Sequence, residues 1–270
     1  MTVDSPSGGG QLDALPSTLR VRVDAGVARI TLSRPAKRNA LDDATVLGLE
    51  TFFRTLPELV KVVILDSEGD HFCAGLDLAE LTERDTLAGV AHSRMWHRAF
   101  ESIESGTVPV IAVLKGAVVG GGLELATSTH LRVAERSTFY ALPEGQRGLF
   151  VGGGGSVRIP RLIGTSRMVD LMLTGRRYDA SEGHAAGLSH YLVEEGTGLA
   201  AAEALAVRIA GNAPQTNFAV LHALPLIAEA NPREGFLMES LMAAIAQGTD
   251  DAKGRMGEFL GGRAGKVTDA

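Results

Sequence analysis

Cysteine, long apolar runs and blocks of like charge are scarce in this sequence, and each scarcity excludes a class of protein. Cys73 is the one cysteine in 270 residues, which excludes an intrachain disulfide framework and a site made of several thiolates. No apolar run reaches the roughly 20 residues that a membrane-spanning helix needs. The formal net charge is −6 without any charge block, so we expect neither nucleic acid nor a membrane surface as a partner.

Several catalytic and binding motifs are also missing. There is no GxxxxGK[ST] loop and no GxGxxG opening a strand–helix unit, which argues against a nucleotide-phosphate site. The seven histidines show no metal-ligand spacing, so no metal is expected, and His92 and His97 are expected to pack or to face solvent. Ser156 lacks a GxSxG elbow. Cys73 has no clear His–Asp partner, which favours a buried apolar thiol.

The pattern of elements predicts an α/β protein with mostly parallel strands. The expected elements are a hairpin over 19–34, a helix over 42–56 capped by Asp42 or Asp43, a strand over 60–68, a helix over 87–105, strands over 108–116 and 130–135, and an extended piece over 138–144. From about residue 154 onward the pattern is nearly all helical.

Three regions follow from this pattern. Residues 1–18, rich in Ser, Gly and Pro and without the features of a secretory signal, are expected to form a disordered tail of a cytoplasmic protein. Residues 19–200 would form the core that carries the active site. Residues 201–270 would form a helical oligomerisation region, because apolar helices at a chain end often cover another subunit.

Three glycine-rich or acid-bearing turns, at 71–81, 115–126 and 141–156, follow predicted strands. The carboxyl ends of parallel strands are where α/β proteins gather their active sites. Such turns expose successive backbone N–H groups, and two of them facing each other can hold one oxygen atom as an oxyanion hole.

Two of these turns carry glutamates. Glu124 lies within the apolar stretch VVGGGLELA, where a buried and unpaired carboxylate would be costly, so it either faces solvent, caps a helix or performs chemistry. Glu144 lies one predicted strand further on and is either a turn residue or a partner of Glu124. Two carboxylates in one cleft can act as acid and base on one water. Asp77 is expected to be structural, at a helix start.

Five segments carry a resemblance to a known family. They are LSRPAKRNALD (32–42), FCAGLDLAEL (72–81), PVIAVLKGAVVGGGLELA (109–126), LPEGQRGLFVGGGGSVRIPRLIG (142–164) and LMLTGRRYDASEGHAAGLSHYLV (171–193). Together they resemble the crotonase, or enoyl-CoA hydratase/isomerase, superfamily over residues 19 to about 266. The chain departs from the usual pattern at Leu76, Ala79, Val151 and Ser156.

The resemblance implies a spiral of repeated ββα units with a C-terminal helical trimerisation region, in a homotrimer or a homohexamer built as a dimer of trimers. It implies acyl-CoA thioester substrates, with CoA as part of the substrate and no separate cofactor. The N–H groups of Leu76 and Gly121 would hold the thioester oxygen, while Glu124 and Glu144 would bind the reacting water. The residues implied in substrate and CoA binding are Lys37, Arg38, Ala40, Ala74, Gly75, Asp77, Leu78, Gly120 and, from a neighbouring subunit, Lys266.

The sequence therefore predicts a hydratase that adds water across the 2,3-double bond of a 2-enoyl-CoA. Within the enzymes, the alternatives are an enoyl-CoA isomerase, which needs one carboxylate, or another crotonase-type reaction on an acyl-CoA. A non-catalytic acyl-CoA binding protein is a third hypothesis, against which the two glutamates and the two glycine turns argue. The acyl pocket is expected to be lined by residues around 80–100.

Overall fold

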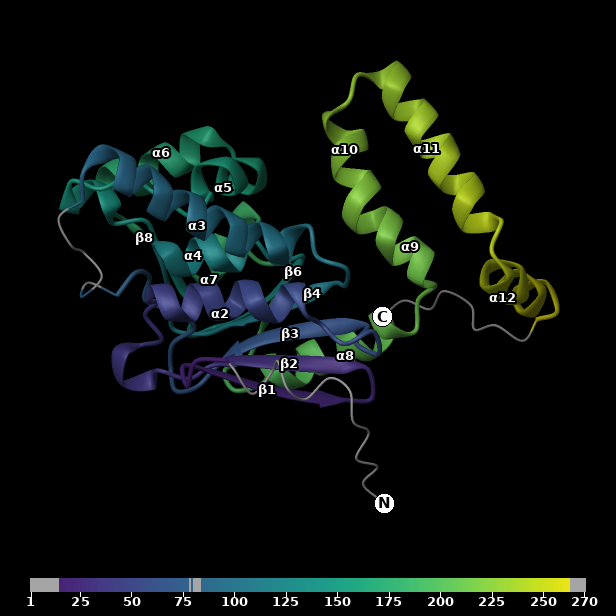
Figure 1. The fold of residues 1–270 in the computed structure, drawn as a ribbon, viewed down its shortest axis with the longest axis horizontal. Helices are drawn as coiled ribbons and strands as arrows, with labels where there is room; N and C mark the ends of the chain where they lie inside the picture. The colour runs from purple at the N-terminus through teal and green to yellow at the C-terminus, as the bar shows by residue number, and fades with distance from the viewer. Residues whose placement is uncertain (1–14, 78, 80–83, 263–270) are drawn as a thin grey trace. The chain divides into compact units, whose positions relative to one another are not determined.

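The fold is described from a computed structural model, which describes residues 15–77, 79 and 84–262 (Figure 1). The chain divides into two compact units, Met1–Ala210 and Gly211–Ala270. The first contains all the strands described below, and the second is helical.

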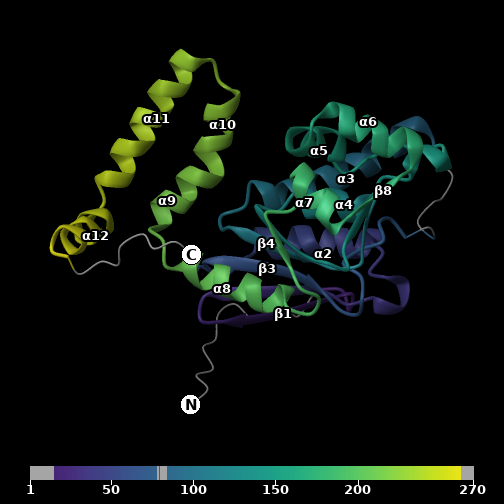
Figure 2. The ribbon, with the colours of Figure 1, turned by 180° about the vertical axis from the view of Figure 1, so that it is seen from behind.

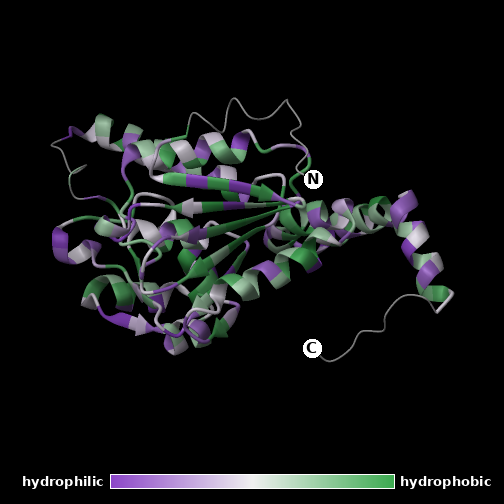
Figure 3. Ribbon diagram, turned by 90° about the horizontal axis from the view of Figure 1, so that it is seen from below, coloured by the Kyte–Doolittle hydropathy of each residue, from purple (hydrophilic) through white to green (hydrophobic). Residues whose placement is uncertain are grey.

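A six-stranded sheet forms the centre of the first unit. Its order is β1-β2-β3-β4-β6-β9, with β1 and β2 antiparallel and every other neighbouring pair parallel. The strands are β1 (Leu19–Asp24), β2 (Val27–Leu32), β3 (Val62–Ser67), β4 (Val110–Leu114), β6 (Leu131–Glu135) and β9 (Tyr191–Val193). Both β3 and β4 are buried along their whole length, as their continuous apolar runs predict. The middle strands of the sheet are coloured hydrophobic along most of their length in Figure 3.

A second, smaller sheet has the order β5-β7-β8, with β5 parallel to β7 and β7 antiparallel to β8. Its strands are β5 (Ala117–Val119), β7 (Phe139–Ala141) and β8 (Arg177–Asp179). Only two residues separate β4 from β5, so the chain passes directly from the large sheet into the small one. The turns that follow β5 and β7 carry Glu124 and Glu144.

Helices cover both faces of the large sheet, as Figures 1 and 2 show. On one face lie α2 (Asp43–Arg54) and α3 (Thr86–Glu104), whose buried residues join the main core. Asp42 caps α2 by accepting from Thr45 N at 2.8 Å, as predicted. On the other face, α8 (Gly198–Ala210) packs Ala202 and Ala206 into a smaller apolar cluster with β3, β4 and β6. The remaining helices of this unit are α4 (Gly121–Thr127), α5 (Gly155–Ile163), α6 (Thr165–Thr174) and α7 (Ala180–Ala186).

The second unit consists of helices α9 (Pro214–Phe218), α10 (Leu224–Glu229), α11 (Pro232–Gln247) and α12 (Asp250–Leu260), with a π-helical turn over Ala219–Ala223. Within this unit many large apolar side chains are exposed, among them Phe236, Leu237, Leu241 and Ile245 on α11. Over the described part of the chain, no helix is both long and apolar enough to cross a membrane.

Three details differ from the sequence-based expectations. The strands β8 and β9 interrupt the region expected to be nearly all helical, because strands of three residues are too short to show a periodic pattern. The expected boundary at 200/201 falls inside α8, which packs on the large sheet. Of the expected tail, residues 1–14 lie outside the described residues, whereas Leu15 packs against the core and the Thr18 hydroxyl accepts from Thr45.

Candidate active site

The two glycine turns predicted to form an oxyanion hole lie side by side. An isolated bridge joins Cys73 to Val118, and Val119 N donates to Cys73 O at 3.1 Å. This pairing holds the 73–77 segment alongside β5 and therefore next to the N-terminus of α4. Gly75 has φ +97°, and a Cβ there would lie 2.8 Å from Val119 O, so the close approach of the two segments requires glycine.

The N–H groups of Leu76 and Gly121 lie close together at this junction. A Cβ added to Gly75 would lie 3.4 Å from Gly121 N, and one added to Gly121 would lie 3.4 Å from Leu76 N. Among the described residues, neither N–H donates to a protein acceptor. Gly121 is also the first residue of α4, so its N–H belongs to the positive end of that helix. The pair is thus free to donate to one oxygen atom of a ligand.

Glu124 is buried, with 3% of its surface exposed, rather than facing solvent. Its Oε1 accepts from Gly153 N and Gly155 N, each at 2.8 Å. Burial raises the pKa of the carboxyl, and these backbone donors oppose that rise because they stabilise the ionised form. The glycines are needed here too, since a Cβ on Gly155 would come within 2.9 Å of the same oxygen.

Glu144 begins the short 3-10 helix Glu144–Arg147 that follows β7. Its Oε2 is buried and has no hydrogen-bond partner among the described residues. Burial and the nearby Glu124 raise the pKa of Glu144 to about 7, against the opposing effects of its own backbone N–H and of Arg147. Glu144 therefore takes up a proton near neutral pH, whereas Glu124 has two backbone donors that favour its ionised form.

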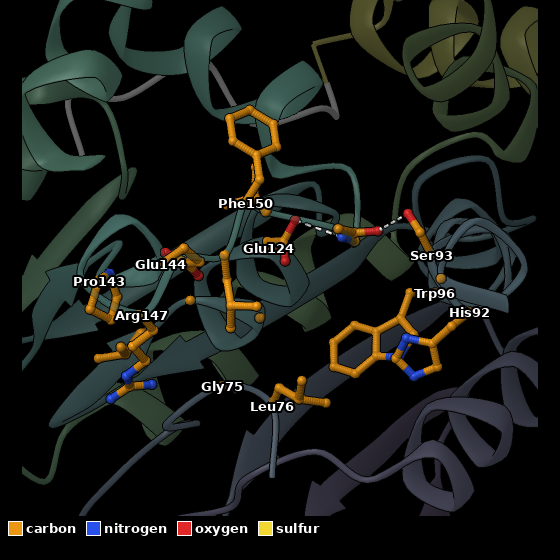
Figure 4. A pocket seen from close by; sticks show the side chains of 18 of the residues that line it. Gly75, Leu76, His92, Ser93, Trp96, Glu124, Pro143, Glu144, Arg147 and Phe150 are labelled. Atoms are coloured by element: carbon orange, nitrogen blue, oxygen red, sulfur yellow. Dashed lines mark hydrogen bonds between the residues drawn. The ribbon is translucent and has the colours of Figure 1, made fainter. Parts of the chain in front are cut away.

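Both glutamates and both glycine turns line one cavity of about 410 Å³. In Figure 4, Glu124 lies near the centre, Glu144 on one side, and Gly75 and Leu76 below. The sequence-predicted residues that line the cavity are Ala74, Gly75, Leu76, Gly120, Gly121, Glu124 and Glu144. A pair of N–H donors and a pair of carboxyls facing one cavity can stabilise a developing oxyanion while moving protons.

The other predicted binding residues are arranged around the 73–77 segment. Ala74 N donates to Arg38 O at 3.0 Å, and Asp77 N donates to Leu41 O at 2.8 Å, so segment 38–41 pairs with this turn. Asp77 is buried, and its pKa is lowered first by the Ala79 N–H and then by Arg34.

Arg34 connects these segments. Its Nη2 lies 2.8 Å from Asp77 Oδ2, and its Nη1 donates to Ala40 O. Lys37 is exposed, with Nζ 3.9 Å from Asp77 Oδ1. Leu78 and Lys266 lie outside the described residues.

Residues around 80–100 were expected to line the acyl pocket, and Arg84, His92, Ser93 and Trp96 do line the cavity. Sequence reasoning did not single out Arg147, Leu149 and Phe150, or the glycines of the 152–153 turn, which line it too. His92 was expected to pack or to face solvent, but it forms part of the cavity wall together with the buried Trp96. The signal was present in the spacing of Gly89, His92, Ser93 and Trp96, which places them on one face of a helix.

Two expectations about other chemistry can be compared with the structure. Cys73 is fully buried, which confirms the prediction of a buried apolar thiol, and burial raises the pKa of the thiol to about 12. Within the described ranges, no group of three or more His, Cys, Asp or Glu side chains is arranged to hold a metal ion.

The geometry agrees with comparisons to known proteins. The family model described as enoyl-CoA hydratase/isomerase matches residues 22–264. The chain belongs to this family. Its fold is that of the crotonase superfamily, as predicted. A crystal structure from Rhodopseudomonas palustris CGA009, named as a candidate enoyl-CoA hydratase, is 57% identical and covers 92% of this chain and 96% of its own, with a TM-score of 0.90.

Two further relatives are less similar in sequence. A candidate enoyl-CoA hydratase from Thermobifida fusca YX, solved in complex with acetoacetyl-CoA, is 26% identical with a TM-score of 0.79, over 90% of this chain and 98% of that one. The fatty acid oxidation complex subunit alpha of Shewanella loihica is 35% identical over 181 residues, which are 64% of this chain. The match spans only about a quarter (26%) of that longer protein.

Proposed function

We propose that this family member is a 2-enoyl-CoA hydratase. The observation that carries the proposal is that two carboxyls and two unpaired N–H donors face one cavity. A thioester oxygen between Leu76 N and Gly121 N would be polarised, which makes C3 of the enoyl group electrophilic and stabilises negative charge as water adds. The acetoacetyl-CoA complex of the Thermobifida fusca relative supports an acyl-CoA ligand.

In the proposed reaction, one water lies between the two carboxyls. Glu124, ionised, takes a proton from this water as its oxygen bonds to C3. Glu144, protonated, gives its proton to C2. The product is a 3-hydroxyacyl-CoA, and a proton passing from Glu124 to Glu144 restores the starting state. The two carboxyls and two N–H groups supply the acid, the base and the charge stabilisation, so the proposal includes no separate cofactor, and CoA enters with the substrate.

Lys37, Arg38, Ala40, Ala74, Gly75, Asp77, Leu78, Gly120 and Lys266 remain proposed substrate- and CoA-binding residues. The exposed Lys37, on the segment next to the oxyanion turn, supports this assignment because its ammonium group makes, among the described residues, only a 3.9 Å ion pair with Asp77 and stays open to solvent, where it can meet a phosphate.

An enoyl-CoA isomerase is the second candidate, since the family name covers both reactions. An isomerase needs one carboxyl to carry a proton between two carbons, so the second buried carboxyl would have no role in that reaction. The presence of both Glu124 and Glu144 in the cavity favours hydration.

The test is direct. Purified protein is incubated with crotonyl-CoA, the loss of conjugated-thioester absorbance is followed, and the product is identified by chromatography. Formation of 3-hydroxybutyryl-CoA supports the proposal. If 2-enoyl-CoAs of all lengths fail while a 3-enoyl-CoA is isomerised, the isomerase is correct. Tight binding of acyl-CoA without turnover of either would indicate a non-catalytic binding protein.

The pH dependence of kcat/KM should report the carboxyl pair. Burial raises the pKa of Glu144 to about 7, and the proposed reaction needs its protonated form. We therefore expect kcat/KM for crotonyl-CoA to fall as the pH rises above about 7, measured from pH 5 to 9 in buffers of constant ionic strength. A value that stays level to pH 9 would contradict the role of Glu144 as acid.

We also propose that the chain assembles as a homotrimer or as a dimer of trimers. The exposed apolar side chains of α11 support assembly, because monomers rarely expose so many large apolar groups on one helix. Light scattering after size-exclusion chromatography should give three or six times the chain mass. Changing Leu237 and Leu241 together to Asp should shift the mass toward the monomer; an unchanged mass would exclude α11 from the interface.

A further inference from the structure

The cavity wall formed by α3 is more polar than an alkyl chain requires. Gly89, His92, Ser93 and Trp96 line the cavity from one face of this helix, and Arg84 lines it from just before the helix begins. A pocket for an unsubstituted acyl chain would be expected to carry aliphatic side chains at these positions. Instead the wall contains a guanidinium, an imidazole and a hydroxyl beside the ring of Trp96.

The hydrogen bonds of this wall show which groups are already used. Ser93 Oγ donates to Gly152 O at 2.6 Å, so its hydroxyl hydrogen is already used in a hydrogen bond within the protein. His92 Nε2 lies 2.8 Å from Asp43 Oδ1, so the first residue of α2 orients the imidazole.

One donor of the wall is not satisfied in this way. Arg84 Nη2 lies 4.0 Å from Asp43 Oδ2, beyond hydrogen-bond distance, and Asp43 is already bonded to His92. Trp96 contributes its ring, because its Nε1 is itself covered by protein. A guanidinium on the wall of a cavity, without a close acceptor among the described residues, suits an oxygen anion.

This wall stands opposite the proposed acid. In Figure 4, His92 and Trp96 lie on one side of the cavity, Glu144 and Arg147 on the other, and Glu124 between them. Trp96 also touches the oxyanion turn, since a Cβ on Gly121 would lie 2.9 Å from its Cζ3. The acyl group beyond the thioester therefore lies within reach of the α3 wall.

We propose that the acyl group of the substrate carries a second carboxylate, bound by Arg84. This inference rests on the proposed function for the identity of the thioester, and names the class of acyl group: the CoA thioester of an unsaturated dicarboxylic acid. Asp43 and His92 position the wall. A phosphate of CoA is the other anion that an acyl-CoA could offer to Arg84, and the experiment separates the two.

The test compares ligands that differ only at the far end of the acyl chain. Binding of saturated acyl-CoAs of four to eight carbons, with a methyl or a carboxylate terminus, is measured by calorimetry. We expect the carboxylate ligand to bind roughly tenfold tighter at one or more lengths, as a buried charged hydrogen bond would give. Tighter binding of the methyl ligand at every length would overturn the proposal.

Variants assign the effect to the wall. Arg84→Met, which keeps an unbranched side chain and removes the charge, should abolish the preference for the carboxylate. The control Arg98→Met removes the same charge from an exposed position of α3 and should retain the preference. If Arg84→Met weakens both ligands equally, Arg84 meets a CoA phosphate and the proposal is wrong.

The same pairs of ligands are also prepared as 2-enoyl-CoAs and tested for hydration. This measurement separates the proposed hydratase activity from the proposed dicarboxylic acyl group. A binding preference without hydration would support the dicarboxylic acyl group and contradict the hydratase. Hydration with a preference for methyl-terminated chains would support the hydratase and contradict the dicarboxylic substrate.

Discussion

Glu144→Gln is expected to lower kcat for hydration of crotonyl-CoA by roughly 10²- to 10⁴-fold, the usual contribution of a positioned acid or base. The amide has the size of the carboxyl and cannot give up a proton to C2. Because the Oε2 atom of Glu144 has no partner among the described residues, the change breaks no hydrogen bond of that atom. KM should change little, so the loss should lie in kcat.

Glu124→Gln is the companion variant and should cause a loss of similar size. The amide oxygen of the glutamine can still accept from Gly153 N and Gly155 N, so we expect the local structure to be retained. Glu203→Gln, at an exposed position of α8, is the matched control and should retain wild-type activity.

Thermal unfolding separates lost chemistry from lost folding. Burial raises the pKa of Glu144 in the folded protein, so the folded state binds this proton more tightly than the unfolded chain does. Stability from this group is present at low pH and is lost as the pH rises from the ordinary carboxyl value through about 7. At pH 8 the Tm of Glu144→Gln should therefore equal or exceed that of the wild type.

Two results would contradict these roles. Hydration within a factor of a few of wild type in either glutamine variant would remove that carboxyl from the proposed mechanism. Retention of 3-enoyl-CoA isomerisation by one variant, with hydration absent from the wild type, would identify a one-carboxyl isomerase.

Gly121→Ala is expected to lower kcat/KM by roughly 10²- to 10³-fold, the size of effect seen when one oxyanion donor is lost. The new Cβ would lie 3.4 Å from Leu76 N and 2.9 Å from Trp96 Cζ3, which places it where the thioester oxygen must sit. Gly121 has no positive φ, so alanine fits the backbone at this position. The effect should thus come from the blocked site and from the displaced Trp96 ring rather than from a broken turn.

The matched control for this variant is Gly254→Ala on α12, where an added Cβ meets nothing within 4 Å. It makes the same one-methyl change in a helix and should leave kcat/KM unaltered, with stability equal or up to about 1 kcal/mol higher. Near-normal hydration by Gly121→Ala, with intact folding, would exclude the Leu76–Gly121 pair as the oxyanion hole.

The sequence by itself determined most of the architecture. Continuous apolar runs predicted β3 and β4, and the cap at Asp42 predicted the start of α2, because these signals depend only on nearby residues. The glycine turns also predicted where Glu124 and Glu144 would meet, since carboxyl ends of parallel strands share one edge. The strands β8 and β9 escaped prediction because three residues carry no period.

Only the tertiary structure decided how the site is charged and shaped. The free N–H groups of Leu76 and Gly121 become a pair because the 73–77 segment bonds to β5, a contact between residues more than 40 positions apart. The raised pKa of Glu144 depends on burial by neighbours distant in the chain. The arrangement of Arg84 and His92 on the cavity wall depends on Asp43 of another helix. Distances and burial between such segments arise only when the chain folds, so local sequence patterns do not reveal them.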